Sequence, residues 1–133
     1  SNNEFVQNND QLSDITIKNC INNEKVSGLD RVGGIAGFTK PAFTLDSCEN
    51  TGEVSGNQYV GGIVGGNYGT LTNSTNYATV IGNINVGGLV GLNHSAGDLS
   101  NSYNKGKVIG NKDVIGGLVG TNNSGKYVSI SFL

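Results

Sequence analysis

The chain has 133 residues, enough for one domain, but its composition is not that of an ordinary globular protein. Only 35% of the residues are hydrophobic, 22 are glycine, and 14% are charged, compared with roughly 25% in a typical domain. The formal net charge is −2, and no Asp, Glu, Lys or Arg occurs from Val54 to Gly97. There is neither a clustered basic surface for nucleic acid nor an apolar run of about 18 residues, so we expect no nucleic-acid partner and no membrane insertion.

Residues 1–14 are rich in Asn and Asp, and we predict that they form a partial coil or cap before the first full repeat, since terminal repeats are usually atypical. Residues 15–126 form the repeat region. Within it, four segments superimpose without gaps: 17–28, 45–56, 71–82 and 99–110. Residues 127–133 alternate apolar and polar side chains and begin a further coil. We expect that coil to be truncated, with an edge that the natural chain continues or a partner covers.

Each segment is followed by a short variable piece and then by a glycine motif of the type Val-Gly-Gly-Leu-Val-Gly. The motif glycines are Gly33, Gly34, Gly37, Gly61, Gly62, Gly65, Gly87, Gly88, Gly91, Gly116, Gly117 and Gly120. The first glycines lie at 33, 61, 87 and 116, so the steps are 28, 26 and 29 residues. A period in this range indicates a solenoid, a propeller or another repeat array.

Each repeat contains three apolar pieces of about 3–6 residues, which are too short and too interrupted for helices. Val, Ile and Thr separated by Gly and Asn are typical of strands and turns. The sequence therefore predicts an all-β fold, a parallel β-helix or β-solenoid with about 27 residues and three short strands per coil. It predicts four coils plus partial ends, with each strand stacked on its counterpart about 4.8 Å away.

Stacking in register places equivalent residues in columns along the solenoid axis. Four apolar columns are predicted: Val26, Val54, Val80 and Val108; Val32, Val60, Val86 and Ile115; Ile35, Ile63, Leu89 and Leu118; and Leu45, Leu71 and Leu99. A polar column contains Asn22, Asn50, Asn76 and Asn104. Stacked amides can bond along the axis as an Asn ladder, or the asparagines can occupy left-handed corners, which Asn tolerates.

The paired glycines have two possible roles. They can supply a backbone with positive φ, or they can let another backbone approach closely because they have no Cβ. Strict alternation places Val60 and Val64 on one face and Ile63 on the other. Either a bulge at Gly61–Gly62 turns Ile63 inward, or Ile63 is covered from outside.

The order of the motif, the variable turn and the following Leu-x-Asn-Ser-x-Asn-x-Gly-x-Val-x-Gly resembles the GLUG repeat, most closely over residues 86–110. The resemblance covers about residues 15–125, with Ala36 standing in a column of valines in the first repeat. It implies a repeat module of a large bacterial exported or surface protein, of the kind found in immunoglobulin A metallopeptidases and adhesins. The expected location is extracellular, secreted or attached to the cell surface.

Motifs for catalysis are absent from the sequence. The chain has one histidine, His94, so no His-Glu-x-x-His zinc site can form, and we expect this loop histidine to be solvated. Gly61-Gly62-x-x-Gly65 lacks the Gly-Lys-Ser/Thr of a phosphate loop. The charge-free middle of the chain leaves no acidic groove for paired carboxylates. We therefore predict a protein that is not an enzyme, with no catalytic residues, no cofactor and no metal site; Asp98 and Asp113 are the only candidate ligands.

Cys20 and Cys48 are 28 residues apart and share a column with Ser74 and Ser102. They can form a disulfide between coils or remain free. We favour free thiols, because parallel Cβ vectors on stacked strands do not converge to the roughly 3.8 Å that a disulfide needs.

Four tyrosines are the candidate ligand-binding residues: Tyr59, Tyr68, Tyr77 and Tyr103. Aromatic rings on a polar wall can stack on sugars, and their hydroxyl groups can hydrogen-bond, but these four do not share one column. Two functions therefore remain open. The first is a stalk that presents neighbouring domains of the same chain, and the second is an adhesin-type module that binds a host glycan or protein.

Overall fold

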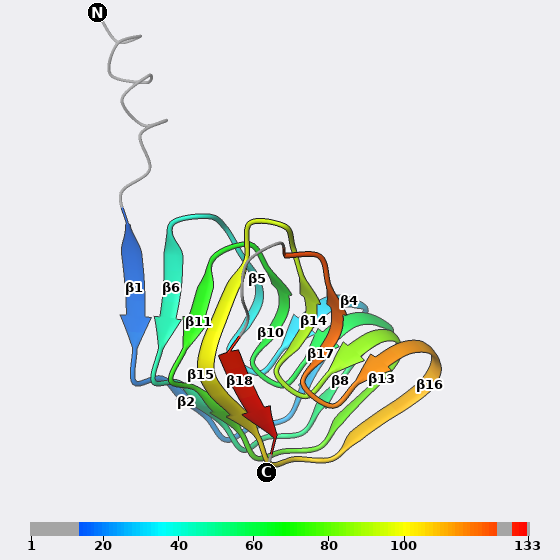
Figure 1. The fold of residues 1–133 in the computed structure, drawn as a ribbon. Coiled ribbons are helices and arrows are strands. Elements are labelled where there is room, and N and C mark those ends of the chain that lie inside the picture. Colours follow the sequence, from blue (N-terminus) through cyan, green and yellow to red (C-terminus); the bar gives the residue numbers. More distant parts are fainter. Residues whose placement is uncertain (1–13, 125–128, 133) are drawn as a thin grey trace, which may run out of the picture.

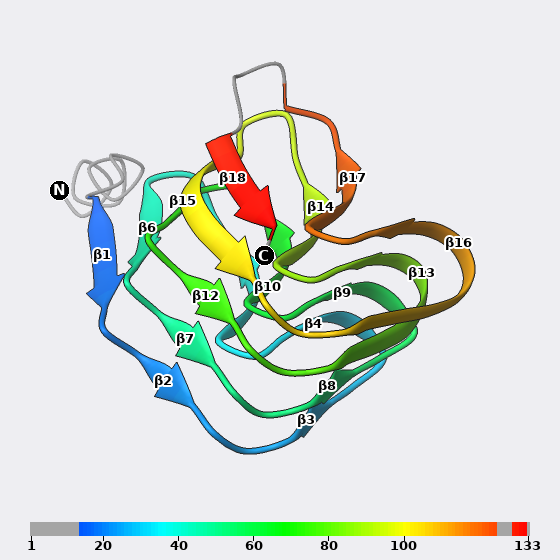
Figure 2. The same cartoon turned by 60° about the horizontal axis from the view of Figure 1, so that its bottom comes forward.

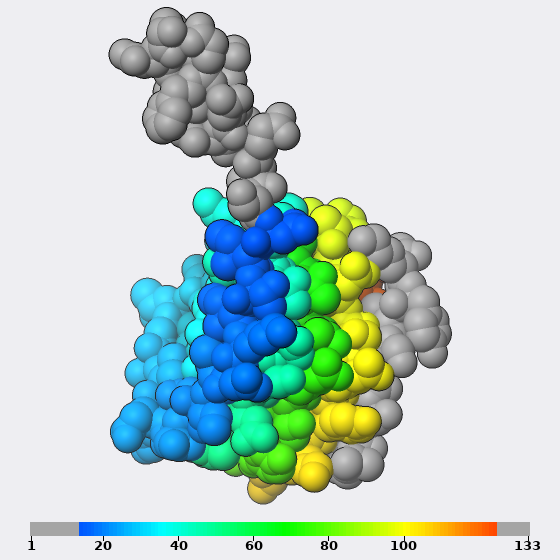
Figure 3. Space-filling view, turned by 90° about the vertical axis from the view of Figure 1, so that its left-hand side faces the viewer, coloured from blue at the N-terminus to red at the C-terminus, as the bar shows by residue number. Residues whose placement is uncertain are grey.

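The chain folds as an all-β solenoid, which confirms the fold class predicted from the period. The computed structural model describes residues 14–124 and 129–132, and these contain strands and turns but no helix (Figure 1). Consequently, no described segment is a helix that could cross a membrane. Successive coils lie side by side as bands in the space-filling view (Figure 3).

The first coil contains β1 (Ile15–Lys18), β2 (Ile21–Asn22), β3 (Val26–Ser27), β4 (Asp30–Gly33) and β5 (Ala36–Thr39). The second contains β6 (Phe43–Asp46), β7 (Glu49–Asn50), β8 (Val54–Ser55), β9 (Gln58–Gly61) and β10 (Val64–Asn67). The third contains β11 (Thr70–Thr72), β12 (Thr75–Asn76), β13 (Val80–Gly87) and β14 (Val90–Asn93). The fourth contains β15 (Asp98–Asn104), β16 (Val108–Gly116) and β17 (Val119–Asn122), and β18 (Ser129–Phe132) follows.

Three parallel sheets form the walls of the solenoid (Figure 2). The first wall contains β1, β6, β11 and β15 with β2, β7, β12 and β18; the second contains β3, β4, β8, β9, β13 and β16; the third contains β5, β10, β14 and β17. The fourth coil has the three strands that the sequence predicts. In the first two coils, the first and second walls are each interrupted, so these coils have five shorter strands.

The strand registers confirm the predicted columns. Val26 pairs with Val54, which is followed by Val80 and Val108 in the same line, and Leu45 pairs with Leu71 and then Leu99. One core cluster lies between the first and third walls: Leu45, Cys48, Ile63, Val64, Leu71, Leu89, Val90 and Leu99. A second cluster lies inside the second wall: Val32, Val54, Val60, Val80 and Val86.

The Gly-Gly pair forms the corner between the second and third walls. β9 ends at Gly61 and β10 begins at Val64, and Ile63 in the corner is fully buried in the same cluster as Val64. Ile63 therefore faces inward because the chain changes walls. Neither a bulge within a strand nor an outer cover is needed.

The glycines act through close approach. No glycine among the described residues has positive φ, so the left-handed alternative is wrong. A Cβ on Gly62 would overlap the Gly88 carbonyl oxygen and the side chain of Asn76. Gly34 stands in the same relation to Asn50, and Gly88 to Asn104.

The asparagine column is a hydrogen-bonded ladder. The Nδ2 atoms of Asn22, Asn50 and Asn76 donate to Oδ1 of the next asparagine at 2.8, 2.9 and 2.9 Å. Each also donates to the carbonyl two residues ahead, as from Asn76 to Ala78 at 2.8 Å. None of these asparagines has positive φ, so the corner alternative is wrong for them. The ladder and the second motif glycine together form one contact, which we call the Asn–Gly lock.

The two ends of the chain are described in part. Residues 1–13 of the predicted cap, and Tyr127, Val128 and Leu133 of the predicted further coil, lie outside the described residues. Within that further coil, β18 pairs in parallel with β15, and Ser102 opposite Ile130 keeps the 28-residue offset.

Candidate functional site

The four candidate tyrosines fall into two groups on different parts of the solenoid. Tyr59 is half-buried in β9, shortly before the corner between the second and third walls, and Tyr68 is half-buried directly after β10, where the chain leaves the third wall. Tyr103 lies in β15 of the first wall and Tyr77 directly follows β12 of the same wall; they are 36% and 44% exposed. The structure does not bring all four together, so a single tyrosine surface does not form.

The first group belongs to a larger surface that the sequence analysis missed. The Tyr68 ring stacks on His94 with a centroid distance of 3.9 Å, and Phe38 meets Tyr68 edge-on at 4.8 Å. The guanidinium carbon of Arg31 lies 5.5 Å from the Phe38 centroid and 5.8 Å from the Tyr59 centroid. We call these five residues, Arg31, Phe38, Tyr59, Tyr68 and His94, the arginine–aromatic surface.

His94 is therefore not the solvated loop residue that we predicted. It is half-buried against Tyr68, and its Nδ1 lies 3.3 Å from the Ser95 hydroxyl. The period explains the stack. The backbone N–H groups of Tyr68 and His94 donate to the carbonyl oxygens of Thr39 and Asn67, one coil earlier in each case. The 28- and 26-residue steps thus place Lys40, Tyr68 and His94 in one column, a signal that was present in the sequence.

Arg31 and Tyr59 also share a column, together with Asn85 and Val114. All four have φ between 55° and 58°, a left-handed turn immediately before the Gly-Gly corner. The backbone approaches closely here, because a Cβ on Gly65 would lie 2.6 Å from the Arg31 carbonyl carbon. The Asp30–Gln58 and Val32–Val60 registers hold Arg31 and Tyr59 one above the other.

Gly66 leaves space for the Arg31 side chain on the third wall. Its column neighbours on the third wall are Phe38 and Leu92, whereas Gly66 itself has no side chain. A Cβ built there would lie 3.7 Å from the Phe38 ring and 3.8 Å from Arg31 Nε. The arginine side chain therefore lies across the outer face of the third wall, beside Phe38.

The second tyrosine group has one cation of its own. Lys105 Nζ lies 5.4 Å from the Tyr77 centroid, and Tyr103 stands two residues before Lys105 on the neighbouring coil. On the same wall, Asn73 Nδ2 donates to Asp46 Oδ1 at 3.0 Å, and this hydrogen bond lowers the pKa of Asp46. The exposed faces of the first wall thus carry contacts between coils that differ from one coil to the next.

Comparison with known families bears on the repeat itself. Residues 56–81 and 82–109 each match the family model described as the GLUG motif. Residues 56–109 are a GLUG-motif repeat region. Each matched GLUG unit contains both partners of one Asn–Gly lock, Gly62 with Asn76 and Gly88 with Asn104. The chain has no significant match among curated proteins or among solved structures.

A second polar ladder runs through the GLUG region and was missed by the sequence analysis. Thr39 Oγ1 donates to Asn67 Oδ1 at 2.7 Å, Asn67 Nδ2 to Asn93 Oδ1 at 3.0 Å, and Asn93 Nδ2 to Asn122 Oδ1 at 2.9 Å. Its positions repeat with the same 28-, 26- and 29-residue steps as the motif, which could have revealed it. Among the described residues, no buried side-chain nitrogen or oxygen lacks a partner.

The cysteine column is also part of the interior. Cys20 and Cys48 are free thiols. The backbone N–H of Cys48 donates to Ser74 Oγ, and that of Ser74 donates to Ser102 Oγ, both at 3.1 Å. Burial raises the pKa of the Cys48 thiol, which disfavours its reactive thiolate form.

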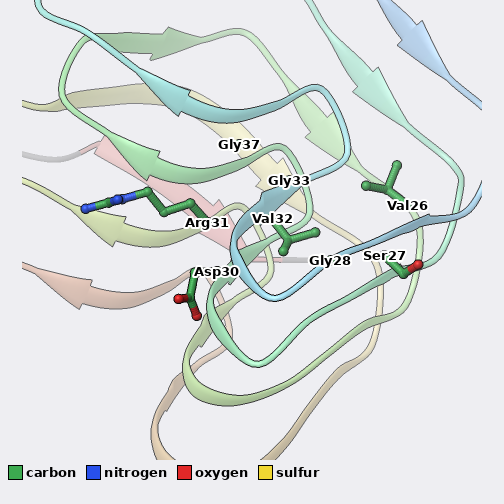
Figure 4. A pocket seen from close by; sticks show the side chains of 8 residues that line it. All are labelled: Val26, Ser27, Gly28, Asp30, Arg31, Val32, Gly33 and Gly37. Carbon is green, nitrogen blue, oxygen red and sulfur yellow. The ribbon is translucent and has the colours of Figure 1, made fainter.

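One hollow of about 270 Å³ lies at the first coil, lined by Val26, Ser27, Gly28, Asp30, Arg31, Val32, Gly33 and Gly37 (Figure 4). Val26 and Val32 line this open end of the valine core, while the Arg31 side chain points away from them. No three His, Cys, Asp or Glu side chains of the described residues converge on a possible metal site. The hollow is thus largely an exposed end of the core.

Proposed function

We propose that this chain is a non-catalytic extracellular spacer: a stalk segment that presents neighbouring domains of a large bacterial surface or secreted protein. The observation that supports it is the Asn–Gly lock, which is repeated from coil to coil with the same partners. Because each coil offers the next one the same interior, coils can be added in series without redesign of the core. The same role would suit an accessory segment of an immunoglobulin A metallopeptidase, whose active site would lie elsewhere in that protein.

A spacer should set a distance. Stacked strands rise about 4.8 Å per coil, so four additional coils extend the solenoid by roughly 20 Å. The GLUG unit 82–109 can be inserted between Ile109 and Gly110 without breaking the period, since Gly110 pairs with Gly82.

The test is a coil-number series on an anchored protein. Variants with zero, two or four additional copies of 82–109 would carry a terminal epitope and be displayed on a cell surface. We expect the epitope to extend further from the cell surface, and so to bind antibody more readily, as the number of coils increases. It should not change when all four candidate tyrosines are replaced by Asn. Antibody binding to the epitope that does not change with the number of coils would contradict the spacer function.

A second candidate, a binding module for a host glycan or protein, is favoured by the arginine–aromatic surface. Its test is a screen of the purified domain against glycans and host proteins. A specific ligand lost on Tyr68→Ala, with coil number held constant, would favour binding over spacing. The two functions are compatible, since a stalk can carry a ligand site on its wall.

A further inference from the structure

We propose that the arginine–aromatic surface is a binding site for an acidic saccharide, in which Arg31 binds the carboxylate and the aromatic rings contact the faces of the sugar rings. This inference rests on the second candidate function and names its site and its ligand class. It starts from the one place where a cation and four rings meet among the described residues.

The arginine is presented in a fixed orientation. Its guanidinium lies within 6 Å of two ring centroids, those of Phe38 and Tyr59, a distance at which cation–π attraction operates. A guanidinium held against a ring keeps its N–H donors along its edge, where they can bind a carboxylate through two parallel hydrogen bonds. Less side-chain entropy is then lost on binding than for a freely rotating lysine.

No described carboxylate neutralises this cation. Among residues 14–124, no Asp or Glu oxygen forms an ion pair with Arg31; the ion pair found there joins Lys25 to Glu53. Asp30 is adjacent in sequence, but its side chain points in a different direction from that of Arg31 (Figure 4). The next two coils contribute Tyr59, Tyr68 and His94 from a segment that has no acidic residue between Val54 and Gly97.

The rings make the surface suitable for a sugar. Phe38 is 41% exposed, and Tyr68 and His94 continue the aromatic surface across two further coils. At about 4.8 Å per coil, these three coils span roughly 10 Å, which is the scale of a short oligosaccharide. Apolar C–H faces can lie on the rings, while the Tyr hydroxyls provide hydrogen bonds.

A nucleic acid is the less suitable ligand. It also combines anionic groups with flat rings, but its affinity comes from several phosphates bound by several cations. The surface has one arginine, with Lys40 as the next cation in the Tyr68–His94 column. One charge beside several rings matches a sugar with one carboxylate.

The test uses the whole chain, labelled with ¹⁵N, in an NMR titration. The probe is a disaccharide that contains glucuronic acid, and the comparison ligand is its carboxyl-reduced neutral form. We expect shifts at Arg31, Phe38, Tyr68 and His94. We also expect at least about tenfold weaker binding of the neutral form, because hydrogen bonds to charged groups contribute more than neutral ones.

Two variants separate the site from general charge effects. Arg31→Asn keeps the left-handed turn, since Asn85 occupies the same column with φ of 55°, and should weaken binding at least about tenfold. Lys105→Gln removes a cation that lies over Tyr77 on the other surface and should leave binding unchanged. Equal binding of both disaccharides, no shifts at the site, or the same loss in both variants would overturn the proposal. So would preferential binding of a single-stranded oligonucleotide probe.

Failure of this inference would leave the other proposals testable. If another glycan or a host protein binds near Tyr77 and Tyr103, the chain is a binding module with its site on the first wall. If nothing binds but epitope reach still follows coil number, the spacer function stands alone.

Discussion

The inner and outer faces of the same strands follow the repeat to different degrees. On the inner face of β2, β7, β12 and β15, the column is Asn22, Asn50, Asn76 and Asn104, the same residue in every coil. One residue earlier, on the outer face, the column is Ile21, Glu49, Thr75 and Tyr103, a different residue in each coil. Both columns have the same register, so stacking itself does not demand identity.

The two faces differ because a buried polar side chain needs hydrogen-bond partners within the protein, whereas an exposed one can bond to water. A buried amide loses its contacts with water, so its donors and acceptor need fixed partners. Asn76 finds these partners in three places: Asn50, Asn104 and the carbonyl of Ala78. It also needs Gly62, which leaves room for it. An outer side chain such as Tyr103 remains in contact with water, so the fold does not fix its residue type. Outer positions can therefore be used for binding.

The largest effect is expected where the inner face has no space. Gly62→Ala places a Cβ against the Gly88 carbonyl, which accepts the Gly62 N–H, and against Asn76, which cannot move without breaking the ladder. We expect a loss of about 3 kcal/mol or more in the free energy of unfolding, and a greater loss for Gly62→Val. Urea unfolding followed by circular dichroism measures it.

Gly66→Ala is the matched control. Its Cβ would meet Phe38 and Arg31 at 3.7–3.8 Å, an ordinary contact distance, so we expect a change of less than about 0.5 kcal/mol. Similar losses for the two alanine variants would mean that close approach is not what the motif glycine provides.

The next effect concerns charge inside the ladder. Asn76→Asp replaces the amide donor with an acceptor that faces the Asn104 Oδ1 and the Ala78 carbonyl. The pKa of a buried carboxyl among carbonyl oxygens is raised. The variant should therefore lose stability as pH rises above the unfolded value of about 4. We expect a cost of about 3 kcal/mol at pH 7 and a smaller cost at pH 4, measured by urea unfolding at both pH values.

Asn101→Asp makes the same exchange on the outside, at an exposed residue with φ of 47°. It should change stability by less than about 0.5 kcal/mol at either pH. The inside–outside comparison fails if Asn101→Asp costs as much as Asn76→Asp, or if the loss in the latter does not depend on pH.

A natural outer carboxylate should show the opposite sign. The pKa of Asp46 is lowered, chiefly by the hydrogen bond from Asn73 and then by that from Ser47. A lowered pKa in the folded state contributes stability above the unfolded pKa, which is lost as pH falls through the folded value. Because Asp46 is only partly buried, we expect a small effect: Asp46→Asn should flatten the acid limb of the urea midpoint below about pH 4. Glu49→Gln, on the next strand, is the control, and an equal flattening in both variants would contradict the assignment.

The sequence was informative about the inside because the inside repeats. The period, the columns and the fold class could all be read from residues such as Val60, Gly62 and Asn76, since identical burial selects identical residues. The second ladder was missed because Thr39 begins it and breaks the run of asparagines. The role of the motif glycines could not be decided, because φ and close approach both favour glycine.

The outside was harder to read for the same reason. Arg31 and Phe38 belong to the first coil and His94 to the third, and all three stand at positions where the repeat has no fixed residue. The period could have placed His94 beside Tyr68, but the approach of Arg31 to Phe38 follows from the left-handed turn at Arg31, which the period does not predict. Each of these side chains occurs once in its column, so the period gives their positions but not the surface that they form together.

The smallest effect is expected where an inner column already accepts two residue types. Cys48 Sγ lies 3.6 Å from the Asp46 carbonyl, and Ser74 Oγ donates to the equivalent Thr72 carbonyl at 2.9 Å. Cys48→Ser should therefore keep this bond and place a hydroxyl beside the Cys20 backbone, as Ser74 does beside Cys48. We expect a change of less than about 0.5 kcal/mol in the urea unfolding free energy.

Cys48→Val removes the donor while keeping a buried side chain of similar size, and it should cost about 1 kcal/mol because the column bond is lost. If Ser destabilises as much as Val, the serines at 74 and 102 are not interchangeable with cysteine. In that case, the inner face depends on each coil's own neighbours as much as the outer face does. A thiol reagent provides an independent measurement on the wild-type chain: Cys20 should react first, because Cys48 is fully buried and its pKa is raised.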